Sequence, residues 1–262
     1  METLPLKIPP QLLLGNRIYP PRPTPSTPTN PTPIHIHVYH EPIRVAYNTV
    51  TNLIPALLPP SNLLYPAPDI ILHIGLAAGR KHFALEQGAH GRDYAQIPDV
   101  DGQRFGDDLA ESMFPASRFP DVLKTSFDTA DVLARWVKNL GGSSGGSGDA
   151  VAAAEGAKGT PDVRLSPDAG NFMCGFIYYH SLAHYYSDED GRRRPVAFLH
   201  VPDLSESEEK LREGWDVTVA LIKALVESKR TVGVVDEGIR DTRQGEEVER
   251  EATAAQTDNN FA

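Results

Sequence analysis

The sequence predicts an α/β fold, a three-layer α/β/α sandwich with a mostly parallel central sheet. Short apolar runs alternate along the chain with longer amphipathic segments, the order expected of strands and the helices that cover them. At 262 residues the chain is long enough for one domain with a complete hydrophobic core. Its 40% hydrophobic content and 23 prolines indicate that part of its length lies outside this core.

The first elements follow a proline-rich run, residues 20–33, which predicts an exposed loop because proline cannot donate a hydrogen bond to a helix or a central strand. Residues 34–39 alternate apolar and polar side chains and predict a strand. Residues 47–58 predict a helix that ends before two prolines. Residues 69–74 predict a strand buried in a parallel sheet. Residues 131–140 predict a helix with one apolar face, ended by two glycines.

The second half of the chain continues the alternation. Residues 163–166 and 196–200 predict strands, and residues 170–186 predict a helix between them. Ser205 and Glu208 match a capping box that begins one more helix. The side chains expected to face the core from that helix are Leu211, Trp215, Ile222 and Leu225.

Composition excludes several classes of function. The net charge is −10, and residues 236–262, with eight acidic and three basic residues, carry half of it. No basic stripe with interleaved aromatic residues is present, so we expect no nucleic-acid partner. No apolar run approaches the ~18 residues of a membrane span, and no signal-peptide core is visible, so we expect no membrane partner. A single cysteine allows no intramolecular disulfide and suits a reducing compartment, so a cytoplasmic protein is expected.

Two residues stand where catalysis by a thiol needs them. Cys174 lies at the beginning of the predicted helix 170–186, and His200 ends the predicted strand 196–200. A free thiol, with a pKa near ~8.5, becomes a nucleophile when a helix N-terminus and a neighbouring imidazole favour the thiolate. Sites in open α/β sheets lie at the carboxyl ends of strands, which favours a function for His200. The alternatives are a small buried apolar cysteine and a structural core histidine.

Three sequence blocks resemble the pyroglutamyl peptidase I family, cysteine peptidases that remove N-terminal pyroglutamate. Around the thiol the residues in register with the family motif are Ser166, Asp168, Ala169, Gly170, Phe172, Cys174, Tyr178 or Tyr179, Ser181 and Leu182, with departures at Met173 and Gly175. The second block runs from His73 through Gly75 and Gly79 to Arg80 and is followed by Glu86. The third is the strand that ends in His200 and Pro202. The resemblance spans residues 34–228.

The resemblance implies a catalytic triad and a substrate class. Cys174 is expected to be the nucleophile, His200 its base, and Glu86 the partner that accepts from the His200 ring and stabilises the imidazolium. The expected substrates are peptides with an N-terminal pyroglutamate, and no cofactor or metal is expected. Without the resemblance, Glu86 reads as an ordinary solvated carboxylate. Arg80 is expected to add positive charge nearby, and backbone amides near Cys174 are candidate oxyanion donors.

The resemblance also organises the chain. Residues 141–160 are rich in glycine, serine and alanine and predict a flexible segment. We interpret it as a surface insertion within one domain, because Glu86 and Cys174, on either side of it, must meet. The domains expected are a segment of residues 1–33, an α/β domain of residues 34–228, and an acidic, disordered tail of residues 229–262.

The chain departs from the family pattern at positions tied to substrate. Members of the family begin with a strand, and the aromatic loop after it surrounds the pyroglutamate ring. We expect no such strand and loop in this sequence. Leu76 and Gln96 stand where relatives carry glutamine and arginine. Two further hypotheses therefore stay open: a non-catalytic or impaired relative, and a thiol redox sensor built on Cys174.

Two histidine pairs invite a metal interpretation. His180 and His184 have the i, i+4 spacing of a helical metal site, but Ser181 stands where the zinc-protease motif has glutamate. A helix face near the surface is the favoured interpretation. His35 and His37 share one face of the predicted strand 34–39 without an evident third ligand.

An acidic run resembles the start of a calcium loop. Asp99, Asp101 and Gly102 have the required order, but the twelfth position is Ala110 instead of glutamate. The sequence predicts an Asp-Gly turn there.

Overall fold

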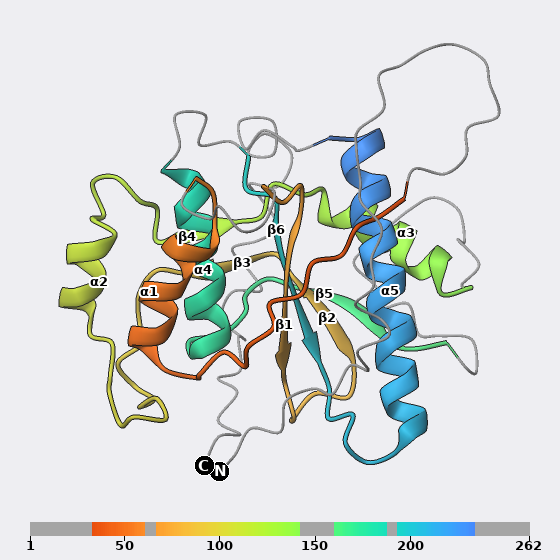
Figure 1. Ribbon diagram of the computed structural model, residues 1–262, viewed down its shortest axis with the longest axis horizontal. Coiled ribbons are helices and arrows are strands. Elements are labelled where there is room, and N and C mark those ends of the chain that lie inside the picture. Colours follow the sequence, from red (N-terminus) through yellow and green to blue (C-terminus); the bar gives the residue numbers. More distant parts are fainter. Residues whose placement is uncertain (1–32, 61–66, 142–159, 188–192, 234–262) are drawn as a thin grey trace, which may run out of the picture.

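A computed structural model describes residues 33–60, 67–141, 160–187 and 193–233 (Figure 1). Within these ranges helices and strands alternate from α2 onward, as the sequence predicts, but three strands follow one another between α1 and α2. The helices are α1 (Tyr47–Leu57), α2 (Asp107–Met113), α3 (Thr129–Asn139), α4 (Met173–Tyr186) and α5 (Glu208–Thr231). The strands are β1 (Ile71–Leu76), β2 (Phe83–Glu86), β3 (Gly88–His90), β4 (Val122–Lys124), β5 (Val163–Ser166) and β6 (Val196–Val201).

The central sheet has four described strands in the order β1-β6-β2-β5. β1 and β6 are parallel, β2 and β5 are parallel, and β2 runs antiparallel to β6. β3 and β4 form a separate antiparallel pair. Two of the three pairings in the central sheet are therefore parallel, which confirms the predicted α/β fold with a mostly parallel sheet.

The alternation of β6 divides the protein into two hydrophobic cores. Val196 and Phe198 pack in the core on the α1 and α4 side. Ala197, Leu199 and Val201 pack in the core on the α3 and α5 side. Figure 1 shows the sheet between these two helix pairs. Because successive side chains of a strand point to opposite faces, one strand serves both cores, and the molecule has three layers.

Helix α4 lies in the centre of an aromatic core. Its residues from Met173 to Ala183 are buried except for Cys174, which is half-buried. Phe176 makes edge-to-face contacts with Tyr47, Tyr94 and Phe105, with ring centroids 4.9, 5.2 and 4.7 Å apart. Such contacts add to the stabilisation from burial. The first turn of α4 is thereby fixed against the sheet.

The opposite core is built on α3 and α5. Trp136 of α3 is fully buried, and its indole Nε1 donates to the Val217 carbonyl of α5 over 2.9 Å. Asp128 caps α3 by accepting from the Asp131 amide. The apolar face predicted for residues 131–140 is confirmed.

The last helix begins two residues later than its predicted capping box. Ser207 is the N-cap and accepts from the Lys210 amide. Ser205 is held elsewhere, because its amide and hydroxyl both donate to Asp203. The predicted core face was partly wrong: Leu225 is buried, but Leu211 is 42% exposed. The buried stripe of α5 follows Val217, Ala220, Leu221, Ala224 and Leu225.

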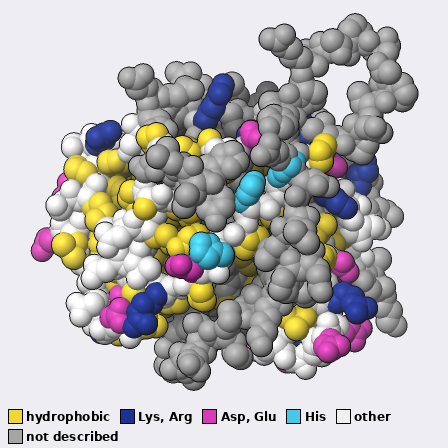
Figure 2. Space-filling model, in the orientation of Figure 1, with side chains coloured by type: hydrophobic (Ala, Val, Ile, Leu, Met, Phe, Trp, Pro, Cys, Tyr) yellow, Lys and Arg dark blue, Asp and Glu magenta, His cyan; other side chains and the backbone are white. Residues whose placement is uncertain are grey.

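The predicted strand over residues 34–39 was wrong. This segment is irregular in the structure, and Ile36 and Val38 are exposed. Alternation alone does not make a strand, since its backbone amides need a neighbouring strand to pair with. Figure 2 shows hydrophobic side chains at the near surface among charged and polar ones. Residues 1–32, most of the predicted insertion and most of the predicted tail lie outside the described residues.

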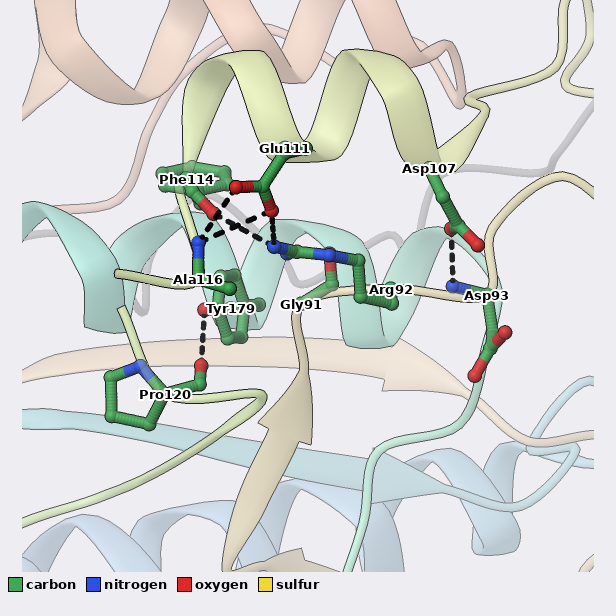
Figure 3. A network of polar contacts seen from close by, with 9 residues as sticks. All are labelled: Gly91, Arg92, Asp93, Asp107, Glu111, Phe114, Ala116, Pro120 and Tyr179. Atoms are coloured by element: carbon green, nitrogen blue, oxygen red, sulfur yellow. Dashed lines mark hydrogen bonds and ion pairs between the residues drawn. The ribbon is translucent and has the colours of Figure 1, made fainter. Parts of the chain in front are cut away.

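A polar network fastens α2 and the loop after it to the rest of the core (Figure 3). Arg92 donates to Glu111 over 2.6 Å and to the Phe114 carbonyl over 2.9 Å. Tyr179 of α4 donates to the Pro120 carbonyl over 2.7 Å. The loop after α2 is thus held at both ends. Among all the described helices, none combines the length and apolarity that crossing a bilayer requires.

Candidate active site

The three residues predicted as a triad meet on the α4 face of the sheet. His200 lies in β6, two residues beyond Phe198 and on the same face. Glu86 ends β2, where the antiparallel register places it opposite Phe198. Cys174 stands in the first turn of α4, directly over this face. Segments far apart in the sequence therefore deliver one side chain each to a single place.

The side chains form a hydrogen-bonded chain. His200 Nδ1 lies 2.7 Å from Glu86 Oε1, and the His200 side chain is also hydrogen-bonded to Cys174. Glu86 is 0% exposed and His200 4% exposed. With Nδ1 directed at the carboxylate, Nε2 is the ring nitrogen left for the thiol. This is the order of contacts that a base needs to take a proton from a nucleophile and hold the resulting charge.

The electrostatics favour a protonated His200. Burial lowers the pKa of His200, but the hydrogen bonds to Cys174 and Glu86 and the negative charges of these two groups raise it to about 9. An imidazolium at neutral pH stabilises a neighbouring thiolate. The arrangement can therefore hold a Cys174 thiolate and a His200 imidazolium as an ion pair.

Arg80 is a further contact of the buried carboxylate. Its Nη1 donates to Glu86 Oε1 over 2.7 Å, so this one oxygen accepts from both Arg80 and His200. The other oxygen, Oε2, is buried and has no hydrogen-bond partner among the described residues. Tyr178 donates to the Glu86 backbone carbonyl over 3.1 Å. The sequence placed Arg80 near the site but did not predict this bond.

The turn before α4 is shaped by two glycines. Gly170 has a φ of +87°, and its amide donates to the Asp168 carboxylate over 3.1 Å. The second oxygen of Asp168 lies 2.9 Å from His90 Nε2. A Cβ on Gly175 would lie 1.8 Å from the Gly170 carbonyl oxygen. Gly175, which departs from the family motif, therefore lets the turn pack directly against the first turn of α4.

A second histidine lies below the thiol. His73 of β1 points to the same face, and its Nε2 lies 2.9 Å from Ser181 Oγ of α4. Burial lowers the pKa of His73 to about 4, so its ring is neutral at pH 7. A Cβ on Gly75, two residues further along β1, would lie 2.9 Å from Cys174 Sγ. The motif contains both residues, and the period of a strand would have placed them on one face.

The histidines considered for a metal are not arranged for one. His180 is buried, so the interpretation of a face near the surface was wrong for this residue. Its ring packs 4.2 Å from Phe176 and 4.7 Å from Phe114, between centroids, and burial lowers its pKa to about 3. His184 Nε2 lies 2.6 Å from the Pro59 carbonyl oxygen. The structure shows no group of three or more potential metal ligands within the ranges it describes.

The predicted Asp-Gly turn is present. Gly102 has a φ of +72°, and its amide donates to the Asp99 carbonyl. The Asp99 carboxylate accepts from the amides of Asp101 and Gln103 and from the Tyr47 amide at the start of α1. These hydrogen bonds from backbone amides engage both carboxylate oxygens, and they connect the turn to the start of α1.

These features define a class of protein: an α/β sandwich with one cysteine at the start of a helix. The cysteine is hydrogen-bonded to a buried histidine, which is in turn hydrogen-bonded to a buried glutamate. No family model matches the chain. It is 28% identical over 173 residues to pyroglutamyl-peptidase 1 of Mus musculus and 29% identical over 173 residues to that of Homo sapiens, covering 66% of this chain and 65% of each relative. It is 30% identical over 135 residues to pyrrolidone-carboxylate peptidase of Deinococcus radiodurans, covering 52% of this chain and 50% of the relative.

Solved structures agree in fold. The chain superposes on pyrrolidone carboxyl peptidase from Pyrococcus furiosus with a TM-score of 0.50 and 20% identity, covering 74% of this chain and 80% of that one. The structure named Pf-PCP(1-204)-C gives a TM-score of 0.51 and 19% identity, covering 71% and 78%. The chain is thus similar to pyroglutamyl peptidases in sequence and in fold, the resemblance that its motifs indicate. It spans just under two thirds of the length of its mammalian relatives.

Proposed function

We propose that this protein is a cysteine peptidase that removes N-terminal pyroglutamate from peptides. Cys174 is the nucleophile, His200 the general base and acid, and Glu86 the group that orients the imidazole. The observation that carries the proposal is the chain of hydrogen bonds from Cys174 through His200 to the fully buried Glu86. The names of the relatives supply the substrate class.

The proposed reaction begins with the ion pair. The Cys174 thiolate attacks the carbonyl carbon that joins pyroglutamate to the next residue, and a C–S bond forms. The C–N bond breaks as His200 gives its proton to the leaving amine, and a pyroglutamyl thioester remains on Cys174. His200 then takes a proton from water, the hydroxide attacks the thioester, and the C–S bond breaks. Pyroglutamic acid leaves, and the ion pair of thiolate and imidazolium is restored.

The charge that develops on the carbonyl oxygen needs donors. The backbone amides at the start of α4, beside Cys174, are the candidates, because the first amides of a helix have no partner within the helix. The close packing of the Gly170 turn against Gly175 keeps these amides in a fixed position. Pre-organised donors of this kind are worth about 3 kcal/mol of barrier in acyl transfer.

One observation favours a second candidate, a non-catalytic relative. β1 is an edge strand of the described sheet, and its Ile74 and Leu76 are 38% and 44% exposed. Leu76 stands where relatives carry a polar residue, at the carboxyl end of this edge strand. A triad without a closed pocket would not hold the pyroglutamyl ring within about 3.5 Å of the sulfur.

The test is hydrolysis of a pyroglutamyl fluorogenic amide by two proteins: the chain as given, and the chain fused to the N-terminal strand and loop of an active relative. We expect weak turnover from the first and a rate at least ~100-fold higher from the second. Cys174→Ala should abolish turnover in the fusion, whereas Ser187→Ala, at the far end of α4, should not. A folded but inactive fusion would reject the peptidase and favour the non-catalytic relative. If, in that inactive protein, peroxide oxidised Cys174 rapidly and reversibly, the redox sensor would be favoured instead.

A further inference from the structure

The two oxygens of the Glu86 carboxylate, at the centre of the site, differ in their hydrogen bonds. Glu86 is fully buried, and one of its oxygens accepts two charged donors while the other accepts none among the described residues. A buried carboxylate is costly unless it is paired and hydrogen-bonded. His200 donates from Nδ1 whether its ring is neutral or protonated, but it balances the negative charge of Glu86 only while the ring is protonated. Arg80 stays protonated throughout, so it is the partner that keeps Glu86 charged when His200 has given its proton away.

We infer that Arg80 is a positioning residue, which keeps the Glu86 carboxylate ionised and its Oε1 turned toward His200 through the whole catalytic cycle. The inference rests on the proposed roles of Glu86, His200 and Cys174. Arg80 thus acts through Glu86 and not directly on the thiol.

The surroundings of the carboxylate support this assignment. The titratable groups that face the Glu86–His200 pair come from the loop after β1, from α4 and from β1 itself. They are Arg80, His82, Cys174, Tyr178 and His73. His73 is neutral at pH 7 because burial lowers its pKa to about 4, and burial raises the pKa of Tyr178 far above neutrality, so it is neutral as well. Arg80 is therefore the permanent cation hydrogen-bonded to this pair.

Arg80 is also reachable from outside. Its side chain is 21% exposed, and it lines a cavity of about 510 Å³ at the edge of the sheet, together with Lys81, Phe83 and Lys210. The guanidinium therefore stands between the buried carboxylate and a space open to small solutes. A guanidinium ion added to a truncated variant has room to take the place of the missing group.

The inference predicts how the thiol responds to pH. Without Arg80 the buried Glu86 takes up a proton, so His200 loses an anion that raises its pKa, and the Cys174 thiolate loses the imidazolium that stabilises it. In Arg80→Gln the rate of Cys174 alkylation by iodoacetamide should fall about tenfold on the acidic side of its pH profile, which corresponds to a shift of about one pH unit. Arg80→Lys should shift far less. Lys81→Ala, from the same cavity, should leave the profile unchanged.

Two further measurements separate positioning from a merely structural role. Guanidinium at millimolar concentration should restore alkylation in Arg80→Ala but not in Glu86→Gln. The profile of Glu86→Gln should also equal that of Glu86→Gln combined with Arg80→Gln, because Arg80 then has no carboxylate to act on. This comparison holds even where Arg80→Gln alone fails to fold, since the double variant buries no unpaired charge.

The His200 imidazole, followed by NMR in the same full-length chain, keeps the test independent of peptidase activity. Its titration midpoint should fall in Arg80→Gln, because a neutral Glu86 no longer raises the His200 pKa, and it should stay in place in Lys81→Ala. A rise would mean that the Arg80 charge acts on His200 directly, which would also overturn the inference. An unchanged midpoint in folded Arg80→Gln, or a further displacement of the double variant beyond Glu86→Gln, would overturn the inference. A wild-type thiol with ordinary reactivity would count against the proposed function alone, because the coupling between Arg80 and His200 is still read from the imidazole.

Discussion

The two faces of the central sheet are built from the same strands but hold different kinds of side chain. Toward α3 and α5 the sheet presents Phe83, Leu85 and Leu199, which pack in an apolar cluster. Toward α1 and α4 the same strands present Glu86 and His200. Alternation lets one strand stabilise the fold on one side and carry polar chemistry on the other. The contrast teaches that the strands bury their titratable side chains on the α4 face, whereas on the other side α5 buries the Ser228 hydroxyl.

The polar groups on the α4 side differ in how well they are satisfied. Glu86 has His200 and Arg80 as partners, and His73 has Ser181. His180 Nε2 is buried with no partner among the described residues. A buried polar atom without a hydrogen bond costs about 1–3 kcal/mol. Because the buried titratable groups Glu86, His180 and His200 lie on this face, it should be the more pH-sensitive of the two.

The largest expected effect comes from the apolar face. Trp136→Ala should lower the free energy of unfolding by about 3–5 kcal/mol, because it empties a fully buried site and breaks the bond to Val217. Urea denaturation measures the loss, and the half-buried Trp215→Ala serves as the matched control with a smaller loss. At temperatures where Trp136→Ala is folded, its Cys174 alkylation profile should match the wild type. A changed profile would show that the two faces are coupled.

A smaller loss is expected at the start of α4. Gly175→Ala places a Cβ where the Gly170 carbonyl oxygen lies at 1.8 Å, so the turn or the helix must shift. We expect a cost of about 3 kcal/mol, the upper part of the range for overpacking. Gly106→Ala is the matched control, since a Cβ there meets nothing within 4 Å. Thermal melting of both variants compares them, and equal stability would mean that the turn yields without cost.

The next effect concerns acid. Burial lowers the pKa of His180 to about 3, whereas the unfolded chain titrates near 6.5. The unfolded state therefore binds a proton that the folded state refuses, and the resulting stability is complete above pH 6.5 and lost as pH falls toward 3. Between pH 6.5 and pH 5 this single group should cost about 2 kcal/mol.

His180→Leu tests this acid sensitivity. Its unfolding free energy, measured with urea at several pH values, should fall less steeply below pH 6.5 than that of the wild type. His73→Asn, which keeps a polar partner for Ser181, should remove a second, separate part of the slope because the pKa of His73 is also lowered, to about 4. Identical slopes in wild type and His180→Leu would contradict the contrast drawn between the two faces.

The smallest effect lies at the rim of the α4 face. The hydrogen bond to Asp168 raises the pKa of His90, against the opposing effect of burial. The pair therefore stabilises the fold fully below pH 6.5, and this contribution is lost as pH rises through the elevated pKa. The His90 side chain is 44% exposed, so solvent screening limits the contribution to a few tenths of a kcal/mol. His90→Gln should lower the melting temperature slightly at pH 6 and not at pH 8, and 0.5 M salt should erase the difference.

The sequence predicted the parts of the fold that local patterns determine. The strand at residues 163–166 was placed with its observed bounds, and the helix at 131–140 and the strand at 196–200 to within two residues. The meeting of Glu86, Cys174 and His200 followed from the resemblance and is present in the structure. Local patterns suffice here because the spacing of the apolar residues in these segments matches the period of the element they form.

The errors arose where contacts with residues outside the local pattern determine the structure. Ser205 was predicted as the N-cap of α5, but its amide and hydroxyl donate to Asp203, and Ser207 is the N-cap instead. Residues 34–39 alternate like a strand but lack a partner in the described sheet. His180 was assigned to a surface because α4 carries histidines at helical spacing, whereas this helix is covered on nearly all sides. The contact of Arg80 with Glu86 depends on the loop after β1, which no sequence period describes.

The direction of β2 has a consequence for depth. β2 runs against β6, so Glu86, although it is the last residue of its strand, pairs with Phe198 and not with a residue at the rim. It therefore sits about 6.5 Å below the level of His200, the length of two strand residues. In a sheet of uniform direction, the end of a strand would lift its carboxylate to the edge, where water screens charge. The reversed direction of β2, which β5 shares, thus places the Glu86 carboxylate beneath the imidazole.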